Sequence, residues 1–181
     1  MIVLVDGPSG SGKTTLATRL GILLRLPVIH MDDFYPGWSG LAAGSDIIAA
    51  SVLKTTDPGY YRWDWANDRA GEWVPVPPGA KIIEGAGAVT AETLRAASIS
   101  DHRVAAIMLT GEATTRYRRA MRRDPYYEPY WEMWSEQEKR HYAVQSQGLG
   151  DLVPTLWIDT TGVDAGQVVR RAYDFITYYV E

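Results

Sequence analysis

The residues with the clearest chemical potential form a glycine-rich run near the N-terminus. Residues 7–14 read GPSGSGKT, in which four residues separate two glycines and Lys13 and Thr14 follow the second. Glycines allow successive backbone N–H groups to point inward around a phosphate, and a following helix adds its positive end. In this motif, called Walker A, the lysine contacts the β- and γ-phosphates and the hydroxyl binds Mg²⁺. The run therefore predicts a site for a nucleoside triphosphate.

The expected ATP contacts extend over the whole run. An apolar segment precedes it and a helix-patterned segment follows it, which is the context in which the motif is specific. We expect the following residues to bind ATP: Gly7, Ser9, Gly10, Ser11, Gly12, Lys13, Thr14 and Thr15. We also expect Lys13 to act in catalysis and Thr14 to hold Mg²⁺.

Two adjacent carboxylates, Asp32 and Asp33, follow the second apolar segment at residues 28–31. The carboxyl ends of parallel strands form the edge where α/β sheets bind ligands, so we expect both acids to lie near the γ-phosphate. Asp33 and the nearby Tyr35 are candidates for substrate binding. A carboxylate there can orient and deprotonate an acceptor hydroxyl. The spacing does not decide which acid is the base. A solvated turn is the alternative interpretation, because Asp, Pro and Gly are common in turns.

An aromatic segment at residues 60–65 encloses Asp64. The chain continues through several prolines to residue 79, and this stretch is too irregular to assign to helix or strand. Long loops in compact domains are often functional. We therefore interpret Trp63 and Asp64 as part of a substrate site, where the carboxylate accepts hydrogen bonds from sugar hydroxyls. A hydrophobic cluster under a loop is the alternative.

Glu84 ends another apolar segment, at residues 81–84. An acid at the carboxyl edge of a strand can accept a hydrogen bond from a substrate hydroxyl or hold a metal through water. Glu84 is therefore a candidate for substrate binding and for a water-mediated Mg²⁺ contact. An ordinary surface residue at a strand end is the alternative.

Five arginines occur within residues 116–123, inside an otherwise acidic protein. On a helix, Arg116, Arg119 and Arg123 share one face, whereas Arg118 and Arg122 share another. Phosphoryl transfer needs cations that close over the reacting group, and the planar guanidinium suits this role. The first face is therefore a candidate phosphate-binding surface. A solvated helix face and a nucleic-acid patch are the alternatives.

Apolar patterning predicts the elements that must position these residues. Strands are expected at residues 2–5, 28–31, 81–84, 104–109 and 155–159. Helices are expected at residues 13–24, 41–53, 90–97, 116–123 and 168–179, and within 126–147 from near Pro129. Because strands alternate with helices, the pattern indicates a single α/β unit with about five parallel strands.

The composition limits the classes of function. The chain has 181 residues, is 46% hydrophobic and carries a formal net charge of −4, so no general attraction to nucleic acid or to an anionic membrane is expected. It contains no cysteine, which excludes disulfides, thiolate zinc sites and cysteine nucleophiles. No apolar run approaches the roughly 20 residues that span a membrane, and we expect a cytoplasmic protein. The sequence does not predict the oligomeric state.

Several of these motifs occur together in one group of enzymes. They are the run at 7–14, His-Met-Asp-Asp-Phe-Tyr at 30–35, Trp-Asp-Trp at 63–65 and Arg-x-x-x-Arg-Asp at 119–124. With them the chain resembles the uridine kinase-like group of P-loop kinases, to which the nicotinamide riboside kinases are close relatives. The resemblance covers residues 1 to about 125.

The resemblance implies a particular fold. It is a three-layer α/β/α sandwich, with a five-stranded parallel sheet in the order 2-3-1-4-5 and an arginine-bearing lid. A single P-loop kinase domain would span residues 1–181, with a substrate-side insertion at about residues 36–79 and the lid at about residues 113–130.

The resemblance also implies roles for individual residues. The first acid after the second strand, here Asp32, would be the base toward the acceptor hydroxyl. Asp64 would bind the ribose, and the lid arginines, here Arg119 and Arg123, would contact the transferred phosphate. The chain departs from uridine kinases where Trp65 and the alanine after it replace His-Pro, so the pyrimidine pocket of that group is not recognisable.

These features predict a kinase that uses ATP and Mg²⁺ to phosphorylate a hydroxyl of a small substrate, with a nucleoside favoured. A nucleoside monophosphate kinase is an alternative, because Arg118 and Arg122 are surplus cations that suit an acceptor phosphate. A nucleotide-dependent switch or regulatory binding module is an alternative of another class. The sequence lacks the guanine-reading Asn-Lys-x-Asp pattern, which disfavours the switch.

Overall fold

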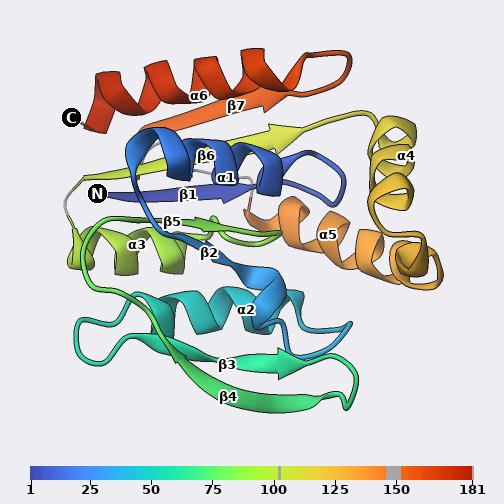
Figure 1. The fold of residues 1–181 in the computed structure, drawn as a ribbon, viewed down its shortest axis with the longest axis horizontal. Coiled ribbons are helices and arrows are strands. Elements are labelled where there is room, and N and C mark those ends of the chain that lie inside the picture. The colour runs from blue at the N-terminus through green and yellow to red at the C-terminus, as the bar shows by residue number, and fades with distance from the viewer. Residues whose placement is uncertain (102, 146–151, 181) are drawn as a thin grey trace.

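A five-stranded parallel sheet forms the centre of the protein (Figure 1). The computed structural model describes residues 1–101, 103–145 and 152–180. The strands are β1 (Ile2–Asp6), β2 (Val28–His30), β5 (Lys81–Glu84), β6 (Val104–Thr110) and β7 (Thr155–Asp159). Their spatial order is β2-β5-β1-β6-β7. Counted along the chain within this sheet, the order is 2-3-1-4-5, which confirms the expected topology.

Helices cover both faces of the sheet, as the alternating pattern predicted. In β1, Val3 and Val5 pack with α1 (Lys13–Leu24) and α6 (Ala165–Val180), whereas Ile2 and Leu4 pack on the side of α3 (Ala91–Ser100). Every residue of β1 is buried, which is typical of a parallel strand covered on both faces. The result is the expected three-layer sandwich, with two separate hydrophobic clusters on either side of the sheet.

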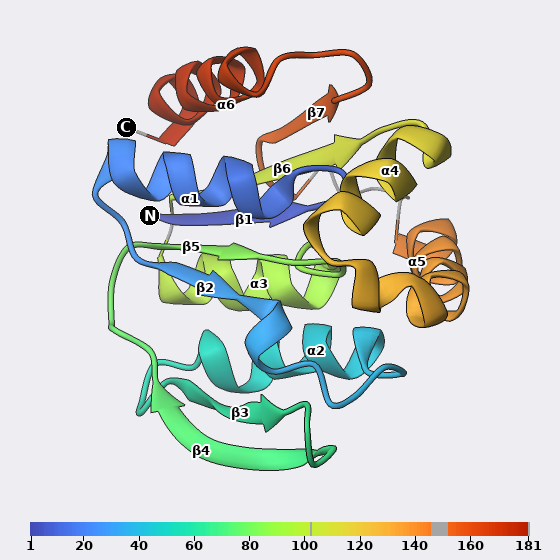
Figure 2. The same ribbon diagram turned by 45° about the vertical axis from the view of Figure 1, so that its right-hand side comes forward.

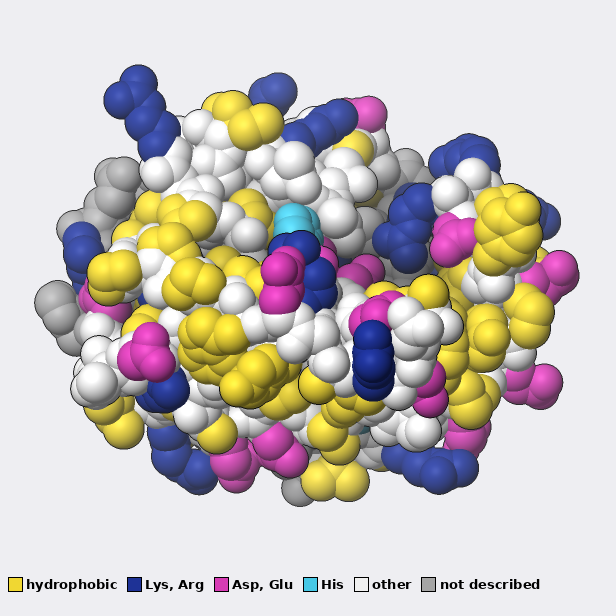
Figure 3. Space-filling model, turned by 60° about the horizontal axis from the view of Figure 1, so that its bottom comes forward, with side chains coloured by type: hydrophobic (Ala, Val, Ile, Leu, Met, Phe, Trp, Pro, Cys, Tyr) yellow, Lys and Arg dark blue, Asp and Glu magenta, His cyan; other side chains and the backbone are white. Residues whose placement is uncertain are grey.

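The insertion between β2 and β5 contains a helix and a hairpin. The helix α2 (Leu41–Ile47) continues into a wider turn over Ile48–Val52, and the hairpin pairs β3 (Gly59–Asp64) with β4 (Arg69–Pro75). This hairpin was missed by the sequence analysis, which left the stretch unassigned. Its register shifts between Tyr61 and Trp63, and most of its residues are exposed, so no regular alternation marks the strands. Hydrophobic side chains spread over this outer face (Figure 3).

The segment after β6 lies at the carboxyl end of the sheet (Figure 2). It comprises α4 (Ala113–Arg123), a 3₁₀ segment η3 (Pro125–Tyr130) and α5 (Trp131–Gln145). The α4 helix ends before Pro125, and the Asp124 side chain then accepts a hydrogen bond from the backbone N–H of Tyr126. The expected helix near Pro129 therefore begins two residues later, and Gln147 at its expected end lies outside the described residues.

None of the helices in the described part of the chain is both long enough and apolar enough to cross a lipid bilayer.

Candidate active site

The Walker loop is curled at the carboxyl end of β1, where it leads directly into α1. Gly10 and Gly12 have φ angles of 76° and 99°, a region that L side chains rarely adopt. A Cβ atom at Gly10 would also collide with the backbone of Arg116 in α4. The glycine is therefore needed both for the turn and for the close approach of the arginine-bearing helix.

A buried carboxylate, Asp6, holds the start of this loop. Its oxygens accept hydrogen bonds from the backbone N–H groups of Gly7 (2.6 Å), Gly87 (2.9 Å) and Val89 (2.8 Å). The Tyr142 hydroxyl donates a fourth, at 2.8 Å. The sequence analysis did not single out Asp6, because one acid after an apolar run gives no signal of these distant partners. Through these hydrogen bonds, Asp6 fixes the Walker loop against the loop after β5.

A groove of about 580 Å³ runs along one side of the Walker loop. Its walls come from the loop, from α4 and from the turn after β7, and they include Thr14, Thr15, Arg122 and Arg123. Arg119 also lines this groove, and its guanidinium donates to the hydroxyl (2.9 Å) and the carbonyl (2.8 Å) of Thr160. The groove therefore joins the amide-lined loop to three arginines, an arrangement that suits a nucleotide with its phosphates.

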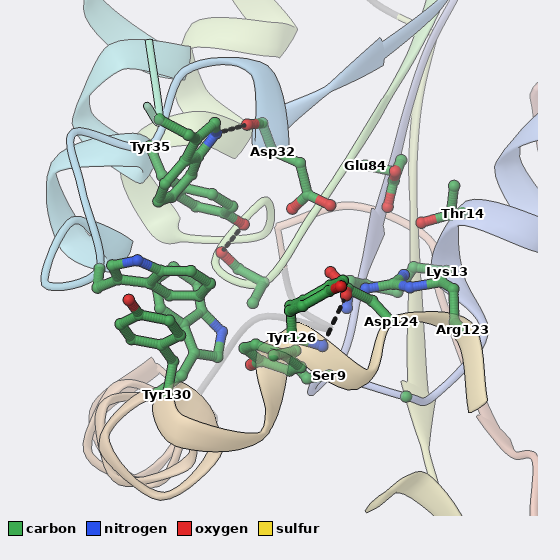
Figure 4. A pocket seen from close by; sticks show the side chains of 16 residues that line it. Ser9, Lys13, Thr14, Asp32, Tyr35, Glu84, Arg123, Asp124, Tyr126 and Tyr130 are labelled. Atoms are coloured by element: carbon green, nitrogen blue, oxygen red, sulfur yellow. Dashed lines mark hydrogen bonds between the residues drawn. The ribbon is translucent and has the colours of Figure 1, made fainter. Parts of the chain in front are cut away.

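A second cavity, of about 440 Å³, lies on the other side of the same loop. Lys13, Thr14 and Arg123 line both cavities, and Asp32 and Glu84 line only the second. Figure 4 shows the carboxylates of Asp32 and Glu84 and the hydroxyl of Thr14 around one space, with Lys13 and Arg123 beside it. The two cavities thus meet at the residues that the sequence analysis assigned to the γ-phosphate.

The far end of the second cavity is aromatic. Seven rings line it: Tyr35, Trp38, Trp65, Tyr126, Tyr127, Tyr130 and Trp134. Trp38 stacks on Tyr130 with ring centroids 3.8 Å apart and an angle of 3° between the planes. This stack joins the insertion to the segment η3. The rings come from three parts of the chain. The sequence analysis named Tyr35 and included Trp65 in its aromatic segment at residues 60–65, and it named none of the other five.

The two adjacent acids point to different surroundings. Asp33 accepts a hydrogen bond from the Tyr60 hydroxyl at 3.0 Å and lies 3.9 Å from Arg62, so its carboxylate is engaged with the hairpin. Asp32 lines the second cavity, and its backbone carbonyl accepts a hydrogen bond from the indole N–H of Trp65 at 3.0 Å. Geometry therefore favours Asp32 over Asp33 as the group that faces an acceptor.

Glu84 is paired with a histidine from the neighbouring strand. Its carboxylate lies 2.6 Å from Nδ1 of His30, and only 3% of the Glu84 side chain is exposed. The hydrogen bond to Glu84 raises the pKa of His30, although burial opposes this shift. His30 thus holds Glu84 in one orientation at the rim of the site.

The oxygen donors present fit Mg²⁺. The Thr14 hydroxyl and the Glu84 carboxylate are hard ligands of the kind that this ion prefers. Within residues 1–101, 103–145 and 152–180, no cluster of three acidic, histidine or cysteine side chains forms a complete metal site. Mg²⁺ commonly keeps several waters and binds through one or two protein groups together with substrate phosphates, and this site offers that number of ligands.

The surroundings of Asp32 predict how activity depends on pH. Loss of hydration raises the pKa of this carboxyl and the charge of Glu84 acts in the same direction, whereas Lys13, Arg123 and His30 oppose the shift. If Asp32 is the general base, it must be deprotonated to act, so activity would be lost as the pH falls through this raised pKa. We expect the acid limb of kcat/KM to lie above the value of about 3.9 of an ordinary aspartate. A profile of kcat/KM against pH measures it, and an acid limb at or below that value contradicts the prediction.

Two further expected substrate residues, Asp64 and Trp63, do not line the second cavity. The Asp64 carboxylate accepts hydrogen bonds from the backbone and side-chain nitrogens of Asn67 in the hairpin turn, at 3.2 and 2.7 Å, and does not line the cavity. Trp63 packs near Gly37 and is also absent from the cavity wall. Their neighbour Trp65 lines the cavity instead, because the bulge and turn of the hairpin set which side chains face inward.

Comparison with known proteins supports the fold. No protein-family model matches the sequence, and no curated protein is detectably similar to it. Solved structures do match. A gluconokinase from Sinorhizobium meliloti 1021 superposes with a TM-score of 0.62 at 16% identity, over 98% of this chain and 92% of that one.

Two further solved structures superpose in the same way. A shikimate kinase from Acinetobacter baumannii, in complex with shikimate, gives 0.60 at 14% identity, over 98% and 93% of the two chains. A protein described as a possible uridine kinase from Bacillus stearothermophilus gives 0.51 at 16% identity, over 86% and 88%. At these identities the matches show that the fold is shared.

Proposed function

We propose that this protein is an ATP-dependent kinase that transfers the γ-phosphate to a hydroxyl of a small substrate. The observation that carries the proposal is the position of Asp32. Its carboxylate faces a cavity whose one end is the Walker loop with Lys13 and Arg123 and whose other end is an aromatic pocket. An acceptor bound against the aromatic rings would therefore present a hydroxyl to Asp32 and to the phosphate at once. The shared fold with small-molecule kinases supports the same reaction class.

Each residue of the site would have a separate role in phosphoryl transfer. ATP would lie in the groove with its phosphates on the Walker loop, and Asp32 would orient the acceptor hydroxyl and accept its proton. The transition state is loose, and its charge spreads over the γ-phosphate oxygens, where Lys13 and Arg123 provide fixed positive charge. Thr14 and Glu84 would hold Mg²⁺, which supplies further neutralisation of the phosphates. Closure of the arginine-bearing segment would exclude water that could otherwise accept the phosphoryl group.

A nucleoside is the acceptor class that the aromatic end supports best. A flat base stacks favourably on indole and phenol rings, and every base has such a face. Among the described residues that line this cavity, the cations are Lys13 and Arg123, and both lie at the Walker loop. The aromatic end therefore offers no cation for an acceptor phosphate, which disfavours the nucleoside monophosphate alternative. Arg118 is exposed on α4, and Arg122 lines the ATP groove.

An acceptor panel tests the proposal. ADP release would be measured with ATP and Mg²⁺ in a coupled assay, with nucleosides, nucleoside monophosphates and small polyols as acceptors. The expected result is release that depends on the acceptor and is fastest with a nucleoside. Slow hydrolysis that no acceptor accelerates would instead indicate a nucleotide-dependent switch. Fastest release with a monophosphate would exclude the nucleoside assignment while keeping the kinase.

Loss of one aromatic ring should weaken acceptor binding selectively. For Trp38→Ala we expect KM for the acceptor to rise roughly tenfold, since a base-stacking side chain contributes about 1–3 kcal/mol. KM for ATP should change little, because Trp38 does not line the ATP groove. Steady-state kinetics with each substrate varied in turn measure both values. Tyr61→Ala is the matched control, since this ring is in the same insertion and is 60% exposed on the hairpin. Equal effects of the two variants on the acceptor KM would contradict the assignment of the pocket.

A further inference from the structure

Ser9, the third residue of the Walker motif, forms hydrogen bonds to other protein groups through its backbone N–H, its hydroxyl and its carbonyl. The backbone N–H of Ser9 donates to Oε1 of Glu138 at 2.6 Å, and its hydroxyl donates to the same oxygen at 2.7 Å. The hydroxyl also lies 3.0 Å from the Tyr127 hydroxyl. The Ser9 carbonyl accepts from the Arg116 guanidinium at 2.9 Å. The Ser9 amide, expected to bind ATP, is thus directed at a protein carboxylate.

The partner carboxylate is deeply buried. Only 3% of the Glu138 side chain is exposed, and its other oxygen lies 3.9 Å from Arg116. Burial raises the pKa of Glu138, whereas Lys13, the hydrogen bonds from Ser9 and Arg116 favour its charged form. A buried carboxylate persists only where donors and cations compensate its lost hydration. Here those donors belong to the Walker loop and to α4, so the loop and Glu138 depend on each other.

The helix that carries Glu138 contacts the site at three more places. Tyr142, four residues on, donates to Asp6 at the start of the Walker loop, and Gln137 donates to the carbonyl of Trp38 at 2.8 Å. Trp134, four residues before, lines the aromatic pocket. Figures 1 and 2 show α5 at the end of the sheet toward which the strands point. One helix therefore contacts the Walker loop, contributes the Trp134 ring to the aromatic pocket and binds the backbone of Trp38, which lines the same pocket.

We propose that Glu138 is a positioning residue for phosphoryl transfer, which fixes the Walker loop through Ser9 and links it through Tyr127 to the acceptor pocket. This inference rests on the proposed kinase function. Ser9 stands between the anchored start of the loop and the amides of Gly10 to Lys13 that would face the phosphates. Loss of the carboxylate frees Ser9 and lets those amides move, so the effect falls on ATP binding and transfer although Glu138 itself lines neither cavity.

Three variants of α5 test the proposal. Glu138→Ala removes the acceptor of both Ser9 bonds, whereas Glu138→Gln keeps an oxygen that can accept them. Glu136→Gln is the matched control, because Glu136 is half exposed on the same helix and its ion pairs among the described residues are with Lys139 and Arg140. Each variant is assayed for melting temperature, for Kd of a non-hydrolysable ATP analogue with Mg²⁺, and for kcat and KM with ATP and the acceptor.

The expected pattern separates positioning from a merely structural role. For Glu138→Ala we expect Kd for the analogue to rise and kcat/KM for ATP to fall by roughly 10- to 100-fold, the range for hydrogen bonds to a buried charged group. The Gln variant should recover most of this loss, and the Glu136→Gln control should match the wild type. If Glu138→Ala binds the analogue and turns over within twofold of the wild type, or if Gln is as defective as Ala, the proposal is overturned.

A fourth variant decides the matter should Glu138→Ala fail to fold. Ser9→Ala keeps the backbone N–H bond and removes the hydroxyl contacts to Glu138 and Tyr127, so Kd for the analogue should rise about threefold to tenfold. An unchanged Kd overturns the proposal. The binding measurement needs no acceptor. Wild-type protein that releases no ADP in response to any acceptor would therefore refute the kinase function, and the analogue titrations would still decide the role of Glu138.

Discussion

Replacing Lys13 by alanine is expected to reduce kcat by about 10²- to 10³-fold or more, the largest loss that any single side chain of the Walker loop should cause. Lys13 lines both the groove proposed for ATP and the second cavity, proposed for the acceptor. Its charge therefore lies at the point where the γ-phosphate would pass between them. Its Nζ donates to the carbonyl of Pro8 at 3.2 Å. Phosphate oxygens would replace that weak partner, and alanine removes the charge altogether. The measurement is kcat from coupled ADP release at saturating ATP and acceptor.

A second lysine provides the control for this substitution. Lys54 is exposed and lies over the ring of Trp73 on the hairpin, away from both cavities. Lys54→Ala removes the same charge from the protein and should leave kcat within about twofold of the wild type, as surface substitutions usually do. Retention of more than a tenth of the wild-type kcat by Lys13→Ala would show that this lysine does not stabilise the transferred phosphate.

Local signals allowed the sheet and the phosphate loop to be predicted from the sequence. The strands β1 and β6 are buried along almost their whole length and almost all of their residues are apolar, which is typical of parallel strands covered on both faces. The shorter strands β2 and β5 are each marked by two adjacent β-branched apolar residues. The Walker loop depends on glycines at fixed positions, since Gly10 and Gly12 adopt positive φ angles. The strand order came from the resemblance to P-loop kinases, because the sequence of the strands alone does not state which strands pair.

The aromatic pocket could not be predicted, because it is assembled from distant parts of the chain. Trp38 and Tyr130 are 92 residues apart, and nothing near either residue states that their rings will stack. The same holds for Ser9 and Glu138, whose contact spans 129 positions. The sequence contains seven tryptophans and eleven tyrosines but two phenylalanines, which favours a ring-lined site, yet composition does not say which rings form it.

The hairpin explains why the substrate side was only partly anticipated. Successive side chains of a strand face opposite sides, and a bulge changes which of them face inward. The shift between Tyr61 and Trp63 is such an irregularity, and the following turn directs Trp65 toward the cavity, whereas Asp64 binds Asn67. A sequence motif that contains Trp63, Asp64 and Trp65 therefore indicates the right region of the chain. Which of these side chains lines the cavity depends on the bulge and the turn of the hairpin.

Replacing Asp32 by asparagine is expected to lower kcat by about 10²- to 10⁴-fold while ATP binding remains close to that of the wild type. Asparagine has nearly the same shape and keeps an oxygen toward the cavity, but it cannot accept the hydroxyl proton. Asp32 does not line the ATP groove, so Kd for a non-hydrolysable ATP analogue should change little. Because the backbone carbonyl of residue 32 remains, the hydrogen bond from Trp65 should also persist. Coupled ADP release and analogue titration measure the two quantities.

The adjacent acid makes this test decisive. Asp33→Asn changes the same functional group one residue away, where the carboxylate binds Tyr60 and lies near Arg62 instead of facing the cavity. If Asp32 is the base, Asp33→Asn should lose far less activity than Asp32→Asn, and its acid limb in kcat/KM should stay where the wild type has it. If the two variants exchange these behaviours, Asp33 is the base and the hairpin must release it when the acceptor binds. If Asp32→Asn keeps near-normal turnover, proton transfer does not require a carboxylate at this position, and the site must act through the charges of Lys13 and Arg123 alone.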